Sequence, residues 1–145
     1  MRLSLQPPLD ASAYRYTHAL RTRFAETDAM GIIHHGAYPA YLEEARVALL
    51  RDAGHPYEAV RSGADGVDFA VLELFVRYRR PLRFDEAVDV HVLVDGLTRT
   101  TFQVGYLLTV AGETRATAVT VHGAVGPTGR PSRMPAFLAD LVGAG

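Results

Sequence analysis

A short run of chemically reactive side chains precedes the longest helical pattern of this 145-residue chain. The run begins at Asp28, among the turn-forming residues 26–31, and continues with His34 and His35. An aspartate with its usual pKa of about 3.9 is ionised at neutral pH, so it can attack an electrophilic carbon or activate water as a general base. Aspartate is also common in turns and helix caps. Residue types alone leave both roles open.

The start of the predicted helix adds a second chemical feature. The first backbone N–H groups of a helix have no partner within the helix, and the helix dipole favours negative charge beside them. Such amides can stabilise a developing oxyanion. Gly36 stands at this point and has no side chain to block a close approach. The alternative is an ordinary helix start.

The composition argues against several other chemistries. The chain has no cysteine, which excludes disulfides, thiolate–zinc sites and a cysteine nucleophile. The remaining histidines share no metal-ligand spacing, so we expect neither a metal nor a cofactor; they are His18, His55, His91 and His122. All 15 basic residues are arginine, and with 16 acidic residues the net charge is −1. This balance gives no field that would attract nucleic acid or an anionic membrane.

The sequence also predicts a cytoplasmic protein. No apolar run approaches the roughly 18 residues of a membrane-spanning helix. The segment 1–10 lacks the apolar core of a signal peptide. We therefore expect no membrane partner.

Apolar periodicity predicts the elements that must position the reactive groups. Residues 14–24 alternate as in a half-buried strand, and apolar residues recur at helical spacing through 36–53. Pro39 fits only a first helical turn, which puts the helix start near Ala37, and Gly54 suits a left-handed cap. Four more strands are predicted at 68–80, 88–95, 102–110 and 114–125, with a short helix at 136–142.

This order of elements predicts an α+β fold with one sheet. Short turns between strands favour antiparallel neighbours. The sheet should curl around the long helix, whose apolar stripe needs the concave face of the sheet. In the strand at 68–80, alternation puts five residues on one face: Ala70, Leu72, Leu74, Val76 and Tyr78. The length suits a single domain over 1–145, with 1–13 as an irregular lead-in.

Residues 26–46 read E-T-D-A-M-G-I-I-H-H-G-A-Y-P-A-Y-L-E-E-A-R and resemble the 4-hydroxybenzoyl-CoA thioesterase family. The segment 76–85 is also similar to that family's strand and turn. Three positions depart from the family pattern: Glu26 stands where Asp is common, Met30 where Gly is frequent, and His34 where Tyr or Trp is common. The resemblance implies the hotdog fold, an antiparallel five-stranded sheet curled around one long central helix.

The same resemblance implies an activity, the hydrolysis of an acyl thioester to an acid and a thiol. The thiol carrier is coenzyme A or acyl carrier protein. Asp28 would be the nucleophile or general base. The backbone amide at His35, beside Gly36, would receive the oxyanion. The His35 side chain would orient the carbonyl, the water or the departing sulfur, unless it is a locally bonded structural residue.

Further residues are expected to contact the substrate. Met30 and His34 lie near the reacting centre in sequence, and Tyr38 would line the acyl pocket or the helix core. Guanidinium forks suit the phosphates of coenzyme A, and Arg80 and Arg99 are the leading candidates. The wider set is Arg77, Arg79, Arg83, Arg130 and Arg133.

Several alternatives stay open. Glu43 is the rival nucleophile, because another branch of hotdog enzymes uses a helix carboxylate; it could instead pair with Arg46 or with a partner subunit, or face solvent. A hotdog hydratase or dehydratase would need H-x-x-x-x-P-x or D-x-N-P-x-H patterns, which are not evident. A noncatalytic acyl-thioester binding protein would need no carboxylate at Asp28. Open sheet edges and the resemblance together imply a homodimer or homotetramer with sites at subunit interfaces.

Overall fold

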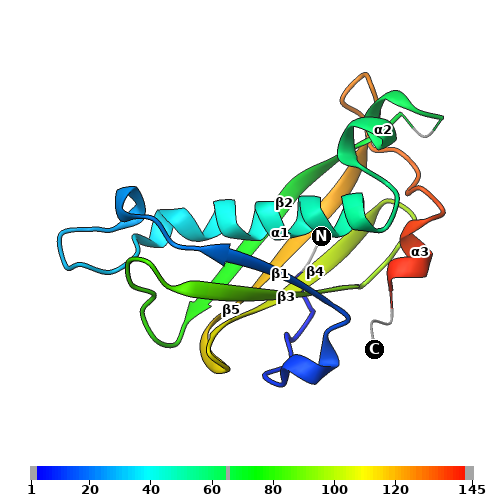
Figure 1. Ribbon diagram of the computed structural model, residues 1–145. Coiled ribbons are helices and arrows are strands. Elements are labelled where there is room, and N and C mark those ends of the chain that lie inside the picture. The colour runs from blue at the N-terminus through cyan, green and yellow to red at the C-terminus, as the bar shows by residue number, and fades with distance from the viewer. Residues whose placement is uncertain (1–2, 65, 143–145) are drawn as a thin grey trace.

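The computed structural model describes residues 3–64 and 66–142. Five strands form one antiparallel sheet in the order β1-β3-β4-β5-β2, and the long helix α1 lies across one face of it (Figure 1). The strands are β1 (Tyr16–Arg21), β2 (Asp68–Tyr78), β3 (Ala87–Asp95), β4 (Thr101–Val110) and β5 (Glu113–Val125); the helices are α1 (Tyr38–Asp52), α2 (Tyr57–Ser62) and α3 (Leu138–Leu141). The predicted hotdog arrangement is confirmed.

Helix α1 begins and ends where the sequence predicts. A 3-10 turn over His35–Ala37 leads into it, and Pro39 lies in its first turn. Gly54 has φ +88° and its N–H donates to the Arg51 carbonyl, so the left-handed cap is confirmed. The helix buries an apolar stripe that includes Tyr41, Leu42 and Ala45. Within the described ranges, no helix is long and apolar enough to cross a membrane.

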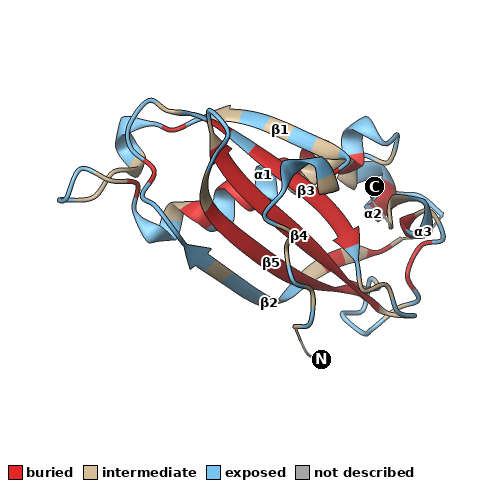
Figure 2. Cartoon of the chain, turned by 90° about the horizontal axis from the view of Figure 1, so that it is seen from below, coloured by how far each residue is buried: buried red, intermediate tan, exposed pale blue. Residues whose placement is uncertain are grey.

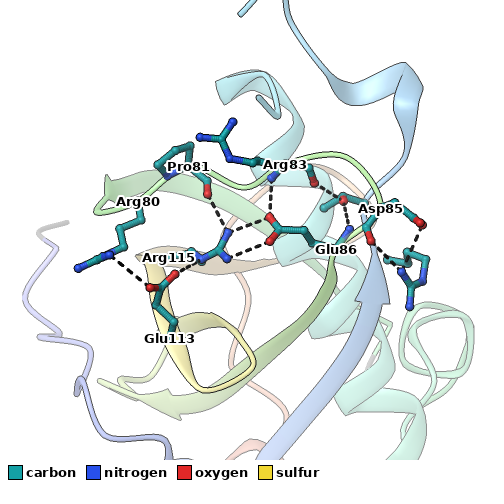
Figure 3. Close-up of polar contacts among 9 residues, drawn as sticks. Arg80, Pro81, Arg83, Asp85, Glu86, Glu113 and Arg115 are labelled. Atoms are coloured by element: carbon teal, nitrogen blue, oxygen red, sulfur yellow. Dashed lines mark hydrogen bonds and ion pairs between the residues drawn. The ribbon is translucent and has the colours of Figure 1, made fainter. Parts of the chain in front are cut away.

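The connection from β2 to β3 differs from the prediction. Short turns do join neighbours at β3–β4 and β4–β5, but β2 pairs with β5 while β3 lies between β1 and β4. The turn 79–86 therefore crosses the end of the sheet. The Arg115 guanidinium fastens this turn through the Pro81 carbonyl and both oxygens of Glu86, at 2.8–2.9 Å (Figure 3).

A bulge in β2 overturns part of its predicted face. The register shifts between Val71 and Glu73, which reverses the alternation of side chains. Leu74, Val76 and Tyr78 pair with Thr120, Ala118 and Ala116 on the helix side. Ala70 instead pairs with Gly123, and Leu72 also lies against Gly123. Ala70 and Leu72 thus lie on the outer face of the sheet, the face away from α1.

The lead-in, residues 3–13, covers part of the outer face; it was predicted to be irregular, but Ala11–Ala13 form a 3-10 helix. Leu5 and Ala13 pack beside a buried cluster of Tyr14, Leu93 and Leu107. The Gln103 side chain holds the lead-in by accepting hydrogen bonds from the N–H groups of Ser4 and Leu5, at 3.0 and 2.9 Å. Strands β4 and β5 are consequently buried on both faces (Figure 2).

Candidate active site

A hollow of about 330 Å³ lies where the loop before α1 meets the end of β2. We call it the Asp28 hollow. Its lining residues come from that loop, from the helix start and from the turn after β2: Asp28, Ile32, Ile33, His35, Tyr38, Tyr78, Arg79, Arg80 and Pro81. The structure thus brings together five of the residues singled out from the sequence: Asp28, His35, Tyr38, Arg79 and Arg80.

The loop carrying Asp28 is held by backbone pairing. Thr27 bridges to Ile33, and Ile32 bridges to Arg83 in the turn after β2. The Ile33 N–H donates to the Leu82 carbonyl at 2.8 Å. These contacts fix the loop against the turn, so the sheet end and the helix start share one hollow.

The two carboxylate oxygens of Asp28 have different surroundings. Oδ1 accepts hydrogen bonds from the N–H groups of Met30 at 2.8 Å and Ile32 at 3.3 Å, which closes the loop in the manner of an Asx turn. Oδ2 has no hydrogen-bond partner among the described residues. The side chain therefore serves the turn through one oxygen and leaves the other available to a ligand.

Glu26 anchors the loop to α1, a role that no pattern in the sequence indicates. Its carboxylate accepts hydrogen bonds from the Arg23 backbone and side chain and from the Tyr41 hydroxyl, the last at 2.6 Å. Burial alone would raise the pKa of Glu26, but the hydrogen bonds from Tyr41 and Arg23 outweigh it and hold the pKa below its usual value. Glu26 therefore stays ionised at neutral pH and links the loop that carries Asp28 to α1.

The helix start presents one engaged and one unengaged amide. The His34 Nδ1 accepts a hydrogen bond from the Gly36 N–H at 2.8 Å. The His34 ring also stacks on His35, with ring centres 4.2 Å apart. The His35 N–H has no hydrogen-bond partner within the part of the chain that the structure describes. His35, which lines the hollow, thus keeps an unengaged amide, whereas the Gly36 amide is capped by a side chain.

Two tyrosines form the wall of the hollow. Tyr38 is 2% exposed, and its ring meets the Tyr78 ring edge-on with centres 4.9 Å apart. Burial raises the pKa of Tyr38, which keeps its hydroxyl protonated. The Tyr78 hydroxyl donates to the His35 carbonyl at 3.4 Å. Tyr78 belongs to the second family-like segment, and that was the only signal that could have identified it as a site residue.

The other predicted site residues lie outside the Asp28 hollow. Met30 is 77% exposed at the tip of the loop, and His34 is the helix cap described above. Arg99 lines a separate hollow together with Arg133. Glu43 is exposed on α1 and lines none of the hollow.

Two charged residues have partners other than those expected. Arg46 donates to the Tyr106 hydroxyl at 3.0 Å rather than pairing with Glu43. Arg80 lines the hollow but its guanidinium contacts Glu113 at 3.3 Å (Figure 3). No cluster of three or more acidic or histidine side chains suited to a metal ion occurs among residues 3–64 and 66–142.

Known proteins resemble this chain in sequence and in fold. The family model described as "Thioesterase-like superfamily" matches residues 22–142. A 1,4-dihydroxy-2-naphthoyl-CoA hydrolase of Gloeothece citriformis is 30% identical over 132 residues, covering 83% of this chain and 86% of that protein. The acyl-CoA thioester hydrolase YbgC of Escherichia coli is 30% identical over 81 residues, 56% of this chain and 59% of that protein. The crystal structure of a hypothetical protein from Aquifex aeolicus has a TM-score of 0.81 and 33% identity, covering 88% of this chain and 98% of that one.

Proposed function

This chain belongs to the thioesterase-like superfamily, and we propose that it works as an acyl-CoA thioesterase whose reaction takes place in the Asp28 hollow. The observation that carries the proposal is the pairing of two unengaged groups on one hollow. These are Oδ2 of Asp28, which can supply electrons, and the N–H of His35, which can donate a hydrogen bond to the carbonyl oxygen; both residues line the hollow. An acyl carbon between them would meet both groups that thioester hydrolysis needs.

The reaction follows from these two groups. Asp28 either attacks the thioester carbonyl, giving a mixed anhydride that water hydrolyses, or removes a proton from the attacking water. In both routes the carbonyl oxygen becomes negative and accepts a hydrogen bond from His35 N–H. The C–S bond then breaks, and the thiolate departs without needing a strong acid. Label from ¹⁸O water in the Asp28 carboxylate after turnover would identify the first route.

The central test is Asp28→Asn. Asparagine keeps an oxygen acceptor for the Met30 and Ile32 amides, so the variant should fold. Without the carboxylate, thiol release from a panel of acyl-CoA thioesters should fall at least about 100-fold, the scale expected for a lost catalytic group. Asp89→Asn, an exposed change on β3, is the matched control. Equal rates in Asp28→Asn and wild type would reject this site.

Glu43→Gln tests the rival carboxylate on α1. Glu43 lies outside the hollow, so its loss should leave the rate within about twofold of wild type. A large loss of activity in Glu43→Gln, with normal activity in Asp28→Asn, would identify Glu43 on α1 as the catalytic carboxylate instead. The same panel, with aromatic and short aliphatic acyl groups, would identify the preferred acyl chain.

The proposal includes a homodimer formed through β2. This edge strand exposes five large apolar side chains between 45% and 52%: Val71, Leu72, Leu74, Phe75 and Tyr78. An open apolar edge is a template for pairing with another strand. Because Tyr78 also lines the Asp28 hollow, a second copy at β2 would border the site. Light scattering should report a dimer or a tetramer for wild type, and Leu74→Glu should shift the molecular mass toward that of the monomer.

The cytoplasmic location stays a prediction.

A further inference from the structure

Glu26 and the α1 residue Tyr41 form a polar pair near the Asp28 hollow, and neither residue lines that hollow. The Tyr41 hydroxyl donates a hydrogen bond to Oε1 of Glu26 at 2.6 Å. We propose that Glu26 and Tyr41 are positioning residues, whose hydrogen bond fixes the Asp28 carboxylate relative to the His35 amide and so sets the rate of the chemical step. The inference rests on the proposed function, because the relative position of these two groups matters only to a reaction between them.

Glu26 stands where the two ends of the Asp28 loop, residues 26–34, meet. Its backbone carbonyl accepts a hydrogen bond from the His34 N–H at 2.7 Å, which closes the loop. The two reacting groups flank this closure, since Asp28 is two residues after Glu26 and His35 is one residue after His34. A displacement of Glu26 would therefore move both groups.

The loop has little apolar packing of its own. It projects beyond the N-terminal end of α1 (Figure 1), and Ile33 is its one buried residue. Tyr41, in contrast, is 4% exposed in the core, and its ring centre is 5.9 Å from that of Tyr38, which lines the hollow. Among the residues that the structure describes, no other hydrogen bond joins the loop to α1. The Tyr41 hydroxyl thus connects an exposed loop to the rigid core.

Glu26 is placed to hold the loop and not to react. Its Oε1 accepts a hydrogen bond from the Arg23 N–H as well as from Tyr41, and its Oε2 accepts one from the Arg23 guanidinium at 3.0 Å. Both carboxylate oxygens are therefore engaged, and the residue lies outside the hollow. Burial raises the pKa of Tyr41, which keeps the hydroxyl protonated as a donor. A protonated donor facing a carboxylate gives a hydrogen bond of the strong, charge-assisted kind.

The length of the Glu26 side chain matters to this role. Aspartate, which is common at this position in the family that the sequence resembles, is shorter by one methylene group. It would leave the Tyr41 hydroxyl without its acceptor unless the loop moved. Glutamine keeps the length and one acceptor oxygen but lacks the charge. Substitution of Glu26 by these two residues therefore separates the effect of position from the effect of charge.

Steady-state kinetics of Tyr41→Phe test the pair with an acyl-CoA that wild type hydrolyses. The substitution removes only the hydroxyl group. We expect kcat to fall at least about tenfold with KM within about twofold of wild type, because a misplacement of about 1 Å can cost about 100-fold in rate. Tyr16→Phe is the matched control, since the Tyr16 hydroxyl donates to the Asp52 carboxylate at 2.7 Å at the other end of α1. It should leave kcat within about twofold. Equal kcat values in Tyr41→Phe and wild type would overturn the proposal.

Two variants of Glu26 distinguish a positioning role from a purely electrostatic one. Glu26→Gln can still accept the hydrogen bond from Tyr41, so kcat should stay within about threefold of wild type. Glu26→Asp keeps the charge but not the reach, so kcat should fall at least about tenfold. The opposite order of the two kcat values would show that the site needs the charge of Glu26, and the positioning role would be wrong.

Hydrogen exchange separates this inference from the proposed function. The His34 N–H, which is bonded to the Glu26 carbonyl, should exchange at least about tenfold faster in Tyr41→Phe than in wild type, and at the wild-type rate in Tyr16→Phe. Absence of thioester hydrolysis by wild type would reject the function, while the exchange rates would still report whether the pair holds the loop. An unchanged exchange rate at His34 in Tyr41→Phe would reject the positioning role in an active enzyme.

Discussion

The middle of the sheet and the loop over residues 22–37 are stabilised in different ways. In β4, Leu107 and Leu108 are both 0% exposed, one beneath the lead-in and the other beneath α1. In the loop, only Thr22 and Ile33 are buried, and the backbone is held by hydrogen bonds to polar side chains such as Glu26 and Asp28. Apolar burial therefore sets the fold, whereas local hydrogen bonds set the site. Stability and activity should respond to different substitutions.

The largest effect on stability is expected at Leu108. Leu108→Ala removes a fully buried side chain from the core under α1 and should lower the free energy of unfolding by about 2–5 kcal/mol. Urea denaturation measures the loss, and kcat/KM per folded molecule should stay near wild type. If Leu108→Ala kept its stability but lost its activity, the separation of the two regions would be contradicted.

Glu86→Gln tests the ion pair that fastens the turn crossing the sheet end. The Arg115 side chain is 13% exposed, so weakening its partnership with Glu86 should cost about 1–3 kcal/mol. Glu58→Gln, an exposed change on α2, should cost nothing measurable. If both variants unfold at the same urea concentration, the turn does not depend on this pair.

The same pair predicts a pH dependence. The hydrogen bond from Arg115 holds the pKa of Glu86 below its usual 4.5. A carboxyl with a lowered folded-state pKa stabilises the protein above its unfolded pKa, and that stabilisation is lost as the pH falls through the folded value. Wild type should therefore lose stability below about pH 4.5, and Glu86→Gln should lose less over the same range. Parallel pH profiles of the two proteins would exclude Glu86 as the titrating group.

Gly31→Ala should have a smaller effect on stability. Gly31 has φ +80°, and no atom lies within 4 Å of the position that an added methyl group would take, so only backbone strain of about 1 kcal/mol is added. Gly112 in the β4–β5 turn has the same φ and the same open surroundings. Gly112→Ala is therefore a matched control, with an equal stability loss but an unchanged kcat. Because Gly31 lies in the Asp28 loop, kcat should fall severalfold in Gly31→Ala but not in Gly112→Ala.

Met30→Ala should change stability least. The side chain is 77% exposed, and substitutions of such residues usually stay within about 0.5 kcal/mol. Thermal melting measures this. If Met30→Ala changes the acyl preference across the substrate panel, the substrate contact predicted for Met30 from the sequence would be supported.

The fold was predictable where a short segment carries its own signal. Alternation predicted β3 and β4, and Pro39 and Gly54 marked the ends of α1. The crossing turn was not predictable, because it depends on Arg115 reaching residues about 30 positions away. The bulge in β2 was hidden because eight of the eleven residues of this strand are apolar or aromatic and they occur on both faces, so alternation could not locate a shift.

The candidate site was predictable only in part. Residue types near Asp28 suggested chemistry, but the family-like segment was needed to connect that chemistry to a thioester. The cap of His34 on Gly36 depends on a rotamer that no spacing specifies. The hollow itself joins the loop to Tyr78, and this contact exists only once β2 has paired with β5.

The lead-in has a consequence for how copies of this chain can assemble. Leu5 and Tyr14 of the same chain already occupy the back of β3 and β4. A second copy could not stack its sheet there without first peeling away a segment held by Gln103. Back-to-back stacking of two sheets at this place would therefore require the lead-in to move.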